Sequence, residues 1–215
     1  MIHFHLISIF PEVFEPYVNS SMMWRAQKEK KATVSLYNVR EYSTDKHRKV
    51  DGKPYGGGPG MVMTIQPILT VVKKIIQRKK NVLILITSPR GEQFTNDTAN
   101  TFAKKYKHIV IIAGHYEGID ARVKKILKAK EASVGDYVLT GGELPALIIL
   151  DATVRQIDGA LGNEESLEDK RVTNGECYTR PEVFTEKGKK YKVPTVLLSG
   201  NHKDIALYRA KNKKK

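Results

Sequence analysis

Two short apolar runs indicate that the chain builds a parallel sheet. They are Val82–Ile86 and Ile109–Ala113, and both are continuous, rich in β-branched residues and bounded by polar positions. Strands that are buried on both faces have this composition. Further strands are expected over residues 2–9, 33–39 and 133–139, where apolar residues are dense but the runs are shorter or interrupted.

Helical spacing of apolar residues separates the expected strands. In the segment 65–78, apolar side chains recur three and four positions apart, as on one face of a helix. Two more helices are predicted over 95–107 and 144–157. Because strands and helices alternate, the sequence predicts an α/β fold with right-handed crossovers.

The chain changes character near Gly159. A polar stretch covers 163–175, a proline-containing segment covers 178–183, and a basic tail follows in which one helix is predicted over 203–210. A length of 215 residues suits about one and a half domains. We therefore expect a main domain over 1–159, a linker over 160–175 and a small basic C-terminal domain over 176–215.

Positive charge is concentrated in two stretches. The formal net charge is +14, to which residues 186–215 contribute +8 and residues 24–53 contribute +5. Basic patches of this kind bind polyanions by releasing counterions from phosphates, so nucleic acid is the favoured partner. A solvated surface that aids solubility is the alternative interpretation of the same charge.

Several classes of protein fit the sequence poorly. The single cysteine, Cys177, excludes an intramolecular disulfide and a cysteine-rich zinc module, and it fits a reducing compartment. No apolar run approaches the ~18 residues of a membrane span, and no secretory leader is recognised at the start. A cytoplasmic protein without membrane attachment is expected. Phosphate-loop, dinucleotide-binding, zinc-protease and serine-hydrolase motifs are also missing from the sequence.

Glycine-containing loops follow the expected strands and are candidates for a ligand pocket. They are Ser88–Gly91, Gly114–Gly118 and Thr140–Pro145. In parallel sheets, ligands bind beyond the carboxyl ends of strands, where glycine lets the backbone approach closely. Each loop alone could be a simple turn, but three together favour a cofactor site. The loop Tyr55–Met61 holds four glycines and is either a ligand cradle or a flexible hinge.

The order of these segments resembles the bacterial tRNA (guanine-N1)-methyltransferases. The resemblance extends from the N-terminus to about Arg209 and includes the Tyr55–Met61 loop. Its most specific motifs are Gly-Asp-Tyr-Val-Leu at 135–139, Gly-Gly-Glu-Leu-Pro-Ala at 141–146 and Tyr-Thr-Arg-Pro at 178–181.

The resemblance implies a fold and an activity that the residue pattern alone does not. It implies a SPOUT-class, mostly parallel sheet with a C-terminal trefoil knot, an obligate homodimer with the active site at the subunit interface, and a small helical C-terminal domain. It also implies S-adenosylmethionine as cofactor, magnesium as a helper ion without assigned ligands, and methylation of N1 of guanosine 37, just 3′ of the anticodon, in tRNA.

Site residues are carried over position by position. The resemblance places Pro59, Gly60, Tyr116 and Glu117 near the target base. His115 and Gly52 depart from the family pattern, which commonly has arginine and aspartate there. The cofactor would be held by Pro89, Gly114, Val134, Gly135, Asp136, Tyr137, Val138, Leu139, Gly141, Gly142 and Pro145.

The implied chemistry needs a base and a fixed cation. Guanine N1 carries a proton that must leave while negative charge spreads to O6. The resemblance assigns the base to Asp169 and the O6 cation to Arg155. From the residues alone, Glu165 or Glu168 could take the place of Asp169, and Arg155 could be an ordinary surface residue of its helix.

Two other functions remain open at this stage. One is an RNA-binding protein that has kept the fold without the chemistry, and the other is a SPOUT methyltransferase acting on ribosomal RNA. Intact Arg155, Asp169 and cofactor loops favour an enzyme, and the Tyr55–Met61 loop favours tRNA. Relatives are expected to continue for a few more helices beyond the lysine-rich end of this chain.

Overall fold

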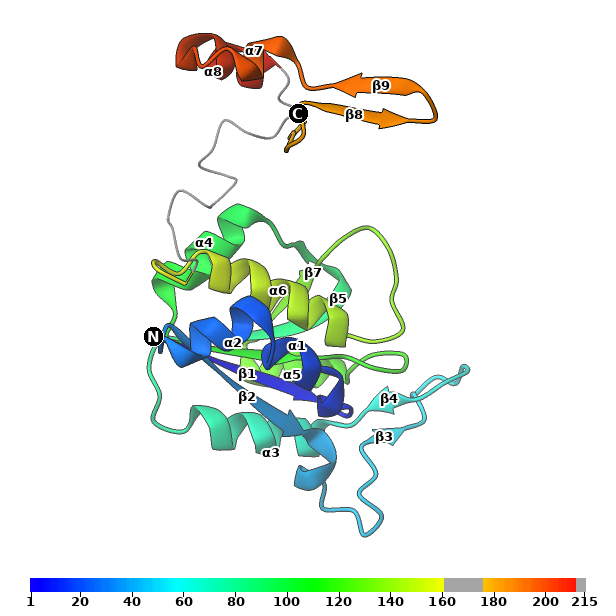
Figure 1. The fold of residues 1–215 in the computed structure, drawn as a ribbon. Coiled ribbons are helices and arrows are strands. Elements are labelled where there is room, and N and C mark those ends of the chain that lie inside the picture. Colours follow the sequence, from blue (N-terminus) through cyan, green and yellow to red (C-terminus); the bar gives the residue numbers. More distant parts are fainter. Residues whose placement is uncertain (161–175, 212–215) are drawn as a thin grey trace. The chain divides into compact units, whose positions relative to one another are not determined.

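The structure is a computed structural model that describes residues 1–160 and 176–211. The chain forms two compact units, Met1–Leu161 and Gly162–Lys215 (Figure 1). The first unit holds the five-stranded sheet and most of the helices. The second is a hairpin followed by two helices.

The central sheet of the first unit is entirely parallel. Its strands are β1 (Ile2–Ser8), β2 (Ala32–Asn38), β5 (Val82–Gln93), β6 (His108–Ile112) and β7 (Lys130–Ser133), in the spatial order β2-β1-β6-β5-β7. Ile109 and Ile111 point into one hydrophobic core, and Val110 and Ile112 point into a second core on the opposite face. The predicted α/β fold with a parallel sheet buried on both faces is therefore confirmed.

Helices cover both faces of this sheet. On one side lie α1 (Glu15–Val18), α2 (Ser21–Lys28), α4 (Asn96–Lys105) and α6 (Glu143–Arg155); on the other lie α3 (Ile65–Ile76) and α5 (Ala121–Leu127). Leu147 and Leu150 of α6 fill the first core, while Ile68 and Val72 of α3 fill the second. Short elements complete the unit: the 3-10 turns η1 (Pro11–Val13) and η2 (Val39–Tyr42), and the small ribbon β3 (Asp51–Gly52) with β4 (Val62–Met63).

The expected strand over 133–139 is wrong. β7 ends at Ser133, which pairs with Gln93, the last residue of β5. Beyond this point the Ser133 hydroxyl donates to the carbonyl oxygen of Gly135 (2.9 Å), which turns the chain away from the sheet. Val138 is 82% exposed, so burial in a core does not stabilise an extended strand here.

Other expected elements lie close to their predicted positions. The helix predicted over 65–78 is α3, and those over 95–107 and 144–157 are α4 and α6. The strand that begins at Val82 continues through Gln93, further than its apolar run indicated. Helices α1, α2 and α5 were not predicted; α1 and α2 are short, with a proline in the first turn of α1 and a serine at the start of α2.

The second unit is built on a β-hairpin. Strands β8 (Val183–Glu186) and β9 (Lys189–Lys192) pair antiparallel through the turn residues Lys187 and Gly188, both with positive φ. The helices α7 (Thr195–Leu198) and α8 (His202–Lys211) follow, and α8 agrees with the helix predicted over 203–210. None of the described helices is long and apolar enough to cross a bilayer.

Three histidines meet at the amino ends of β1 and β6. The His5 ring lies between Tyr37, 3.2 Å from Nδ1, and His108, 3.4 Å from Nε2. His3 stacks on His108 with ring centroids 4.9 Å apart. Burial, reinforced by the neighbouring His108, Lys79 and His3, lowers the pKa of His5 to about 4. Burial therefore favours the neutral form of His5.

Candidate cofactor site

The first loop of the site is an excursion within β5. Thr87 and Glu92 both pair with Ala132 of β7, so residues 88–91 leave the sheet and return to it. Gly91 makes this return possible, because a Cβ atom there would lie 2.5 Å from the backbone nitrogen of Ala132. The excursion holds Pro89 beyond the carboxyl end of the apolar part of β5, where a cofactor residue was predicted.

The second and third loops are hydrogen-bonded to each other. After β6, the Gly114 nitrogen donates to the Thr87 hydroxyl (3.2 Å), and the Gly114 carbonyl accepts from the Gly142 nitrogen (2.7 Å). His115 and Gly141 form an isolated antiparallel bridge. The chain from Gly135 to Gly142 is thus fastened across the end of β6.

These loops enclose one cavity of about 890 Å³. Its wall combines glycine backbone and apolar side chains with charged side chains, among them Arg90, Glu117 and the lysines of α5, which suits a ligand that has both apolar and hydrogen-bonding parts. Among the described residues, the predicted cofactor positions that line it are Pro89, Gly114, Val134, Gly135, Tyr137, Val138, Leu139, Gly141, Gly142 and Pro145.

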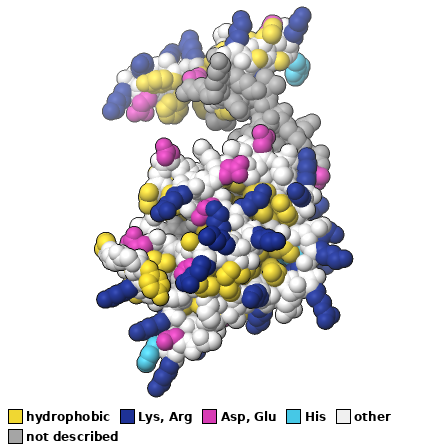
Figure 2. Space-filling model, turned by 180° about the vertical axis from the view of Figure 1, so that it is seen from behind, with side chains coloured by type: hydrophobic (Ala, Val, Ile, Leu, Met, Phe, Trp, Pro, Cys, Tyr) yellow, Lys and Arg dark blue, Asp and Glu magenta, His cyan; other side chains and the backbone are white. Residues whose placement is uncertain are grey.

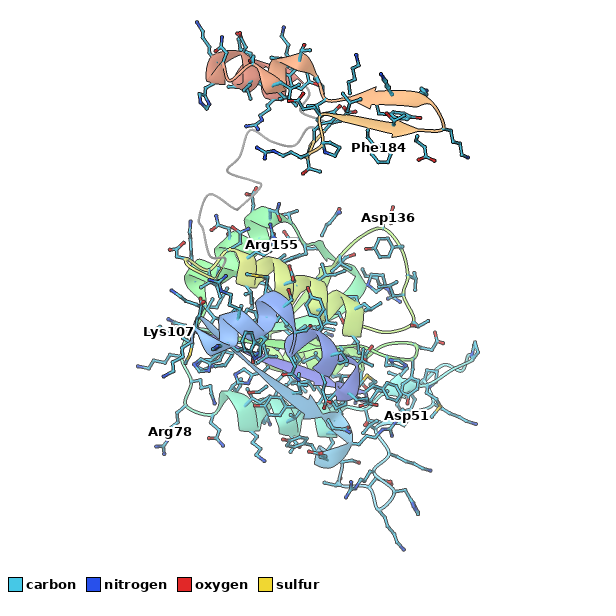
Figure 3. All side chains as sticks on the ribbon, viewed as in Figure 1. Asp51, Arg78, Lys107, Asp136, Arg155 and Phe184 are labelled. Carbon is cyan, nitrogen blue, oxygen red and sulfur yellow. The ribbon has the colours of Figure 1, made fainter. Side chains whose placement is uncertain are left out.

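Not every predicted residue is part of this wall. Tyr116 and Glu117, predicted to lie near the target base, do line the cavity. Gly60 adjoins it, since a Cβ atom at Gly60 would meet the Glu117 side chain, and the Glu117 nitrogen donates to the Met61 carbonyl (2.9 Å). Pro59 and Asp136 are outside the lining; Asp136 lies on the loop that extends beyond the N-terminal end of α6 (Figure 3).

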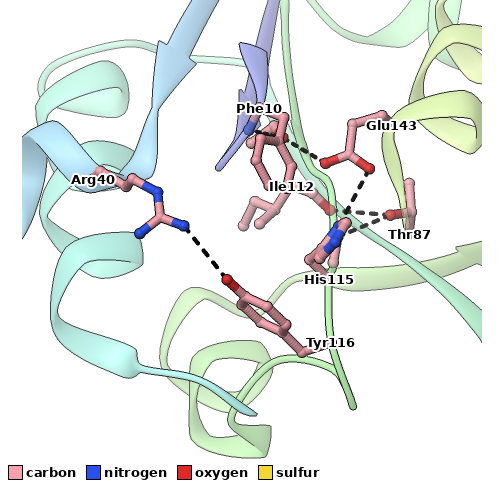
Figure 4. Close-up of polar contacts among 9 residues, drawn as sticks. Phe10, Arg40, Thr87, Ile112, His115, Tyr116 and Glu143 are labelled. Atoms are coloured by element: carbon pink, nitrogen blue, oxygen red, sulfur yellow. Dashed lines mark hydrogen bonds and ion pairs between the residues drawn. The ribbon is translucent and has the colours of Figure 1, made fainter. Parts of the chain in front are cut away.

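A buried carboxylate lies behind the loops and was not singled out from the sequence. Glu143, in the first turn of α6, accepts a 2.5 Å hydrogen bond from the Ser8 hydroxyl, and that hydroxyl accepts from the Phe10 nitrogen (2.8 Å). Its other oxygen lies 3.7 Å from His115 Nδ1 (Figure 4), a buried atom that makes no hydrogen bond in the described part of the chain. Glu143 therefore connects β1, the Gly114 loop and α6.

Tyr116 is positioned from two sides. Its φ is +58°, a left-handed conformation that turns the chain sharply after His115. The hydroxyl accepts a 3.4 Å hydrogen bond from Arg40 of η2 (Figure 4). The ring packs edge-on against His115, with centroids 5.1 Å apart. An aromatic ring is thus held at the cavity wall next to a basic side chain.

The Tyr55–Met61 loop connects β3 to β4. Gly56, Gly57, Gly58 and Gly60 all have positive φ, and Tyr55 at its start is 99% exposed. Only glycine adopts such a succession of conformations without strain, which accounts for its density in this loop.

The two predicted catalytic residues are not brought to the cavity by the described part of the chain. Arg155 is the last residue of α6, and Figure 3 shows it at the end of the helix away from the Asp136 loop. Arg155 comes 13 residues after Gly142, which is about 20 Å along the helix at 1.5 Å per residue. Asp169, with its alternatives Glu165 and Glu168, lies outside the described residues.

Comparison with known proteins decides the family. The family model described as tRNA (Guanine-1)-methyltransferase TrmD matches residues 2–215. The chain belongs to the tRNA (guanine-N1)-methyltransferase family. The resemblance found in the sequence is confirmed, and the enzyme class with it.

Curated relatives in this family match almost the whole chain. A tRNA (guanine-N(1)-)-methyltransferase of Ureaplasma urealyticum is 45% identical over 208 residues, which are 95% of this chain and 88% of the relative. The enzyme of the same name from Clostridioides difficile is 44% identical over 212 residues, 96% of this chain and 90% of the relative. A third relative of the same name, from Carboxydothermus hydrogenoformans, is 42% identical over 210 residues, which are 96% of this chain and 80% of the relative.

A methyltransferase of this family uses S-adenosylmethionine in general, and the cavity has the character that such a ligand requires. Gly91 and Gly142 let the loops around it pack closely, because a side chain at either position would collide with backbone atoms. No group of three or more His, Cys, Asp or Glu side chains in residues 1–160 and 176–211 is arranged to hold a metal ion.

Proposed function

We propose that this enzyme transfers the methyl group of S-adenosylmethionine to N1 of guanosine 37, the nucleotide 3′ of the anticodon in tRNA. The observation that carries the proposal is the convergence of three loops, at 88–91, 114–118 and 134–145, on one cavity in a chain of this family. The bound cofactor would supply an activated methyl group on a sulfonium. The protein must then hold the guanine and remove its N1 proton.

The cofactor would be held mainly by backbone groups of the loop residues 134–142, with Pro89 and Pro145 closing the pocket. Tyr116 and Glu117 lie on the same cavity wall, beside the Gly60 turn. This arrangement supports the proposal that the target base enters from the side of the Tyr55–Met61 loop. We also propose that the fastened segment 134–142 is part of the trefoil knot of the SPOUT class.

For the base and the cation, the proposal keeps Asp169 and Arg155. Asp169 would accept the proton from N1, and Arg155 would donate hydrogen bonds to O6 as negative charge develops there. Magnesium is kept as a helper ion without assigned ligands. The small basic unit that contains β8, β9 and α8 would contact the tRNA, and a cytoplasmic location is proposed with this role.

The distance between Arg155 and the cavity supports a homodimer. Arg155 comes ten residues after Pro145, which lines the pocket, and so lies about 15 Å along α6 from the pocket of its own chain; it can serve another copy's pocket. Leu144 and Ile148 precede Arg155 at helical spacing and are 56% and 44% exposed, so an apolar stripe runs along this helix face. We propose that a second copy buries the stripe and receives Arg155 at its active site.

The primary test is methyl transfer from labelled S-adenosylmethionine to a tRNA transcript with guanosines at positions 36 and 37. A second transcript, with adenosine at 37, is the control. Incorporation into the first transcript alone, mapped to N1, is expected. If S-adenosylmethionine binds but neither transcript is labelled, the proposed reaction is wrong.

Variants test the assigned roles. Asp169→Ala is expected to abolish transfer while S-adenosylmethionine binding is retained. Arg155→Lys is expected to lose most activity, because a point charge does not replace the planar fork. A variant with near-normal turnover would remove the corresponding assignment.

Complementation tests the shared site. Mixed dimers are made by co-expressing Arg155→Ala with a pocket variant such as Gly142→Ala, each inactive alone. Activity should return in the mixture if Arg155 acts across the interface, and should stay absent if it acts within one chain.

A further inference from the structure

One face of α5 lines the cavity with basic side chains. Its residues at the wall are Ala121, Lys124 and Lys125, and Lys128 follows at the C-cap. The spacing of three, four and seven positions is that of a single helix face. The opposite side of α5 is fixed to the sheet by the buried Val123. The lysines are therefore held at the cavity by the packing of the helix.

Two of these lysines have no nearby counter-charge. Lys124 Nζ forms an ion pair with a Glu131 carboxylate oxygen at 2.6 Å. Asp120, at the same wall, forms an ion pair with the Arg122 guanidinium at 2.8 Å. Among the described residues, no carboxylate lies within ion-pair distance of Lys125 or Lys128. Arg90, on the β5 excursion, adds a third unpaired cation to the wall.

Figure 2 views the molecule from behind, on the side away from β2, and Lys and Arg side chains gather in the middle of the first unit there. Their hydrophobic neighbours are exposed between them. The unpaired cations of the cavity wall, Arg90, Lys125 and Lys128, lie outside the two basic stretches that the sequence pointed to, 24–53 and 186–215.

A cationic rim is a poor complement to the cofactor itself. The sulfonium of S-adenosylmethionine carries a positive charge, so unpaired lysines near it raise the free energy of binding. An RNA strand is the complementary partner, because a nucleotide that enters the cavity brings its flanking phosphates to the rim. Lysine side chains are long and carry mobile point charges, which suits contact with phosphates whose positions vary.

We propose that Lys125 and Lys128, together with Arg90 of the β5 excursion, form a phosphate-binding edge that holds the tRNA backbone beside the nucleotide being methylated. This inference rests on the proposed function and assigns it a further binding surface. The edge acts on RNA binding, while the cofactor loops on the inner wall act on S-adenosylmethionine.

The test compares two double variants that remove the same charge. One is Lys125→Gln with Lys128→Gln; glutamine is unbranched and polar, one atom shorter than lysine, and carries the same Cβ strain at 128, where φ is 51°. The control is Lys73→Gln with Lys104→Gln, in the last turns of α3 and α4, exposed and away from the cavity wall. Tight binding of tRNA is measured by fluorescence anisotropy between 50 and 200 mM salt, and S-adenosylmethionine binding by calorimetry.

The edge variant should lose about two phosphate contacts. The slope of log K against log salt should become shallower by about 1.4 to 1.8, and tRNA affinity at 0.15 M salt should fall roughly tenfold or more. The affinity for S-adenosylmethionine and the control variant's tRNA binding should stay at wild-type values.

Two results would overturn the proposal of a phosphate-binding edge. If the edge and control variants bind tRNA with the wild-type slope, these lysines do not contact phosphates. If S-adenosylmethionine affinity falls while the tRNA slope is unchanged, the lysines hold the cofactor's carboxylate instead. Failure of the wild-type protein to methylate the tRNA transcripts is a separate result, since it refutes the proposed reaction while the salt slopes still report on the edge.

Discussion

Replacement of Gly142 with alanine is expected to damage the proposed cofactor pocket through steric overlap between its loops. Gly142 precedes α6 with φ −86° and ψ 0°, a conformation that alanine can adopt, so the effect is steric and not conformational. The added Cβ would fall within contact distance of the Thr87 hydroxyl, and would lie 2.6 Å from the Gly114 nitrogen and 2.9 Å from Cα of Ala113.

The loss of stability in Gly142→Ala depends on which neighbouring atoms must move to make room for the new Cβ. Two of the three neighbours are backbone atoms at the end of β6, which cannot shift without bending the strand. Overpacking of this kind costs about 1–3 kcal/mol. The hydrogen bond from the Gly114 nitrogen to the Thr87 hydroxyl (3.2 Å) would also be distorted, which adds about 1 kcal/mol. A loss of ~2–4 kcal/mol in unfolding free energy is therefore expected.

A graded series of variants makes the reasoning testable. At Gly114, an added Cβ would lie 3.3 Å from the Thr87 carbonyl oxygen, and at Gly52 its nearest neighbour would be 3.9 Å away. Urea unfolding should rank the alanine variants in the order 142, 114, 52 from most to least destabilised. Gly52→Ala should be neutral or stabilising by up to ~1 kcal/mol, because alanine restricts the unfolded chain.

Calorimetric binding of S-adenosylmethionine completes the assay. Gly142→Ala should lose most of its affinity, since its methyl group separates two loops that form the pocket wall. The steric argument is refuted if Gly142→Ala unfolds at the wild-type urea concentration and binds the cofactor with wild-type affinity.

Three further predictions concern other parts of the molecule. The folded-state pKa of His5 is lowered from 6.5 to about 4, so its stabilising contribution is complete above pH 6.5 and falls as the pH decreases toward 4. About 2 kcal/mol of unfolding free energy should be lost over this range. His5→Gln, which leaves His108 in place, should flatten the pH dependence of stability measured by urea unfolding. Ser8→Ala should cost about 1–3 kcal/mol in unfolding free energy, because it removes the donor to the buried Glu143 carboxylate. Deletion of Lys211–Lys215 should weaken tRNA binding and reduce its salt dependence.

Matched controls distinguish these effects from general damage. His47→Gln, which changes an exposed histidine outside the His3–His5–His108 cluster, is the control for the His5 substitution. Ser20→Ala removes an exposed hydroxyl that donates only to the Tyr17 carbonyl (3.2 Å), and should cost less than 0.5 kcal/mol. If the protein without Lys211–Lys215 binds tRNA with wild-type affinity at every salt concentration, these lysines do not contribute to tRNA binding.

Local patterns in the sequence determined the sheet and most of the helices. The runs Val82–Ile86 and Ile109–Ala113 had to be strands buried on both faces, since no polar position offers a solvent side. The spacing in α3 and α6 likewise required helices packed on a sheet. The three glycine loops follow from the same logic, because parallel strands bring their carboxyl ends to one edge.

The tertiary structure decided what happens where local preferences are weak. Residues 133–139 look like a strand, but no partner strand remains beyond Gln93, and the Ser133 hydroxyl stabilises a turn instead. The excursion at 88–91 depends on the approach of Gly91 to the backbone of Ala132, a contact between segments about 40 residues apart. Neither outcome is encoded within the segment itself.

The same division holds for the site. Motif order predicted the three loops that line the cavity, because each motif is contiguous in the sequence. The pairing of Ser8 with Glu143, and the basic face that Lys125 and Lys128 present to the cavity, depend on contacts between distant segments and on which side of α5 is buried. Sequence patterns report the period of burial along one element, whereas contacts between elements are fixed only when their faces pack together.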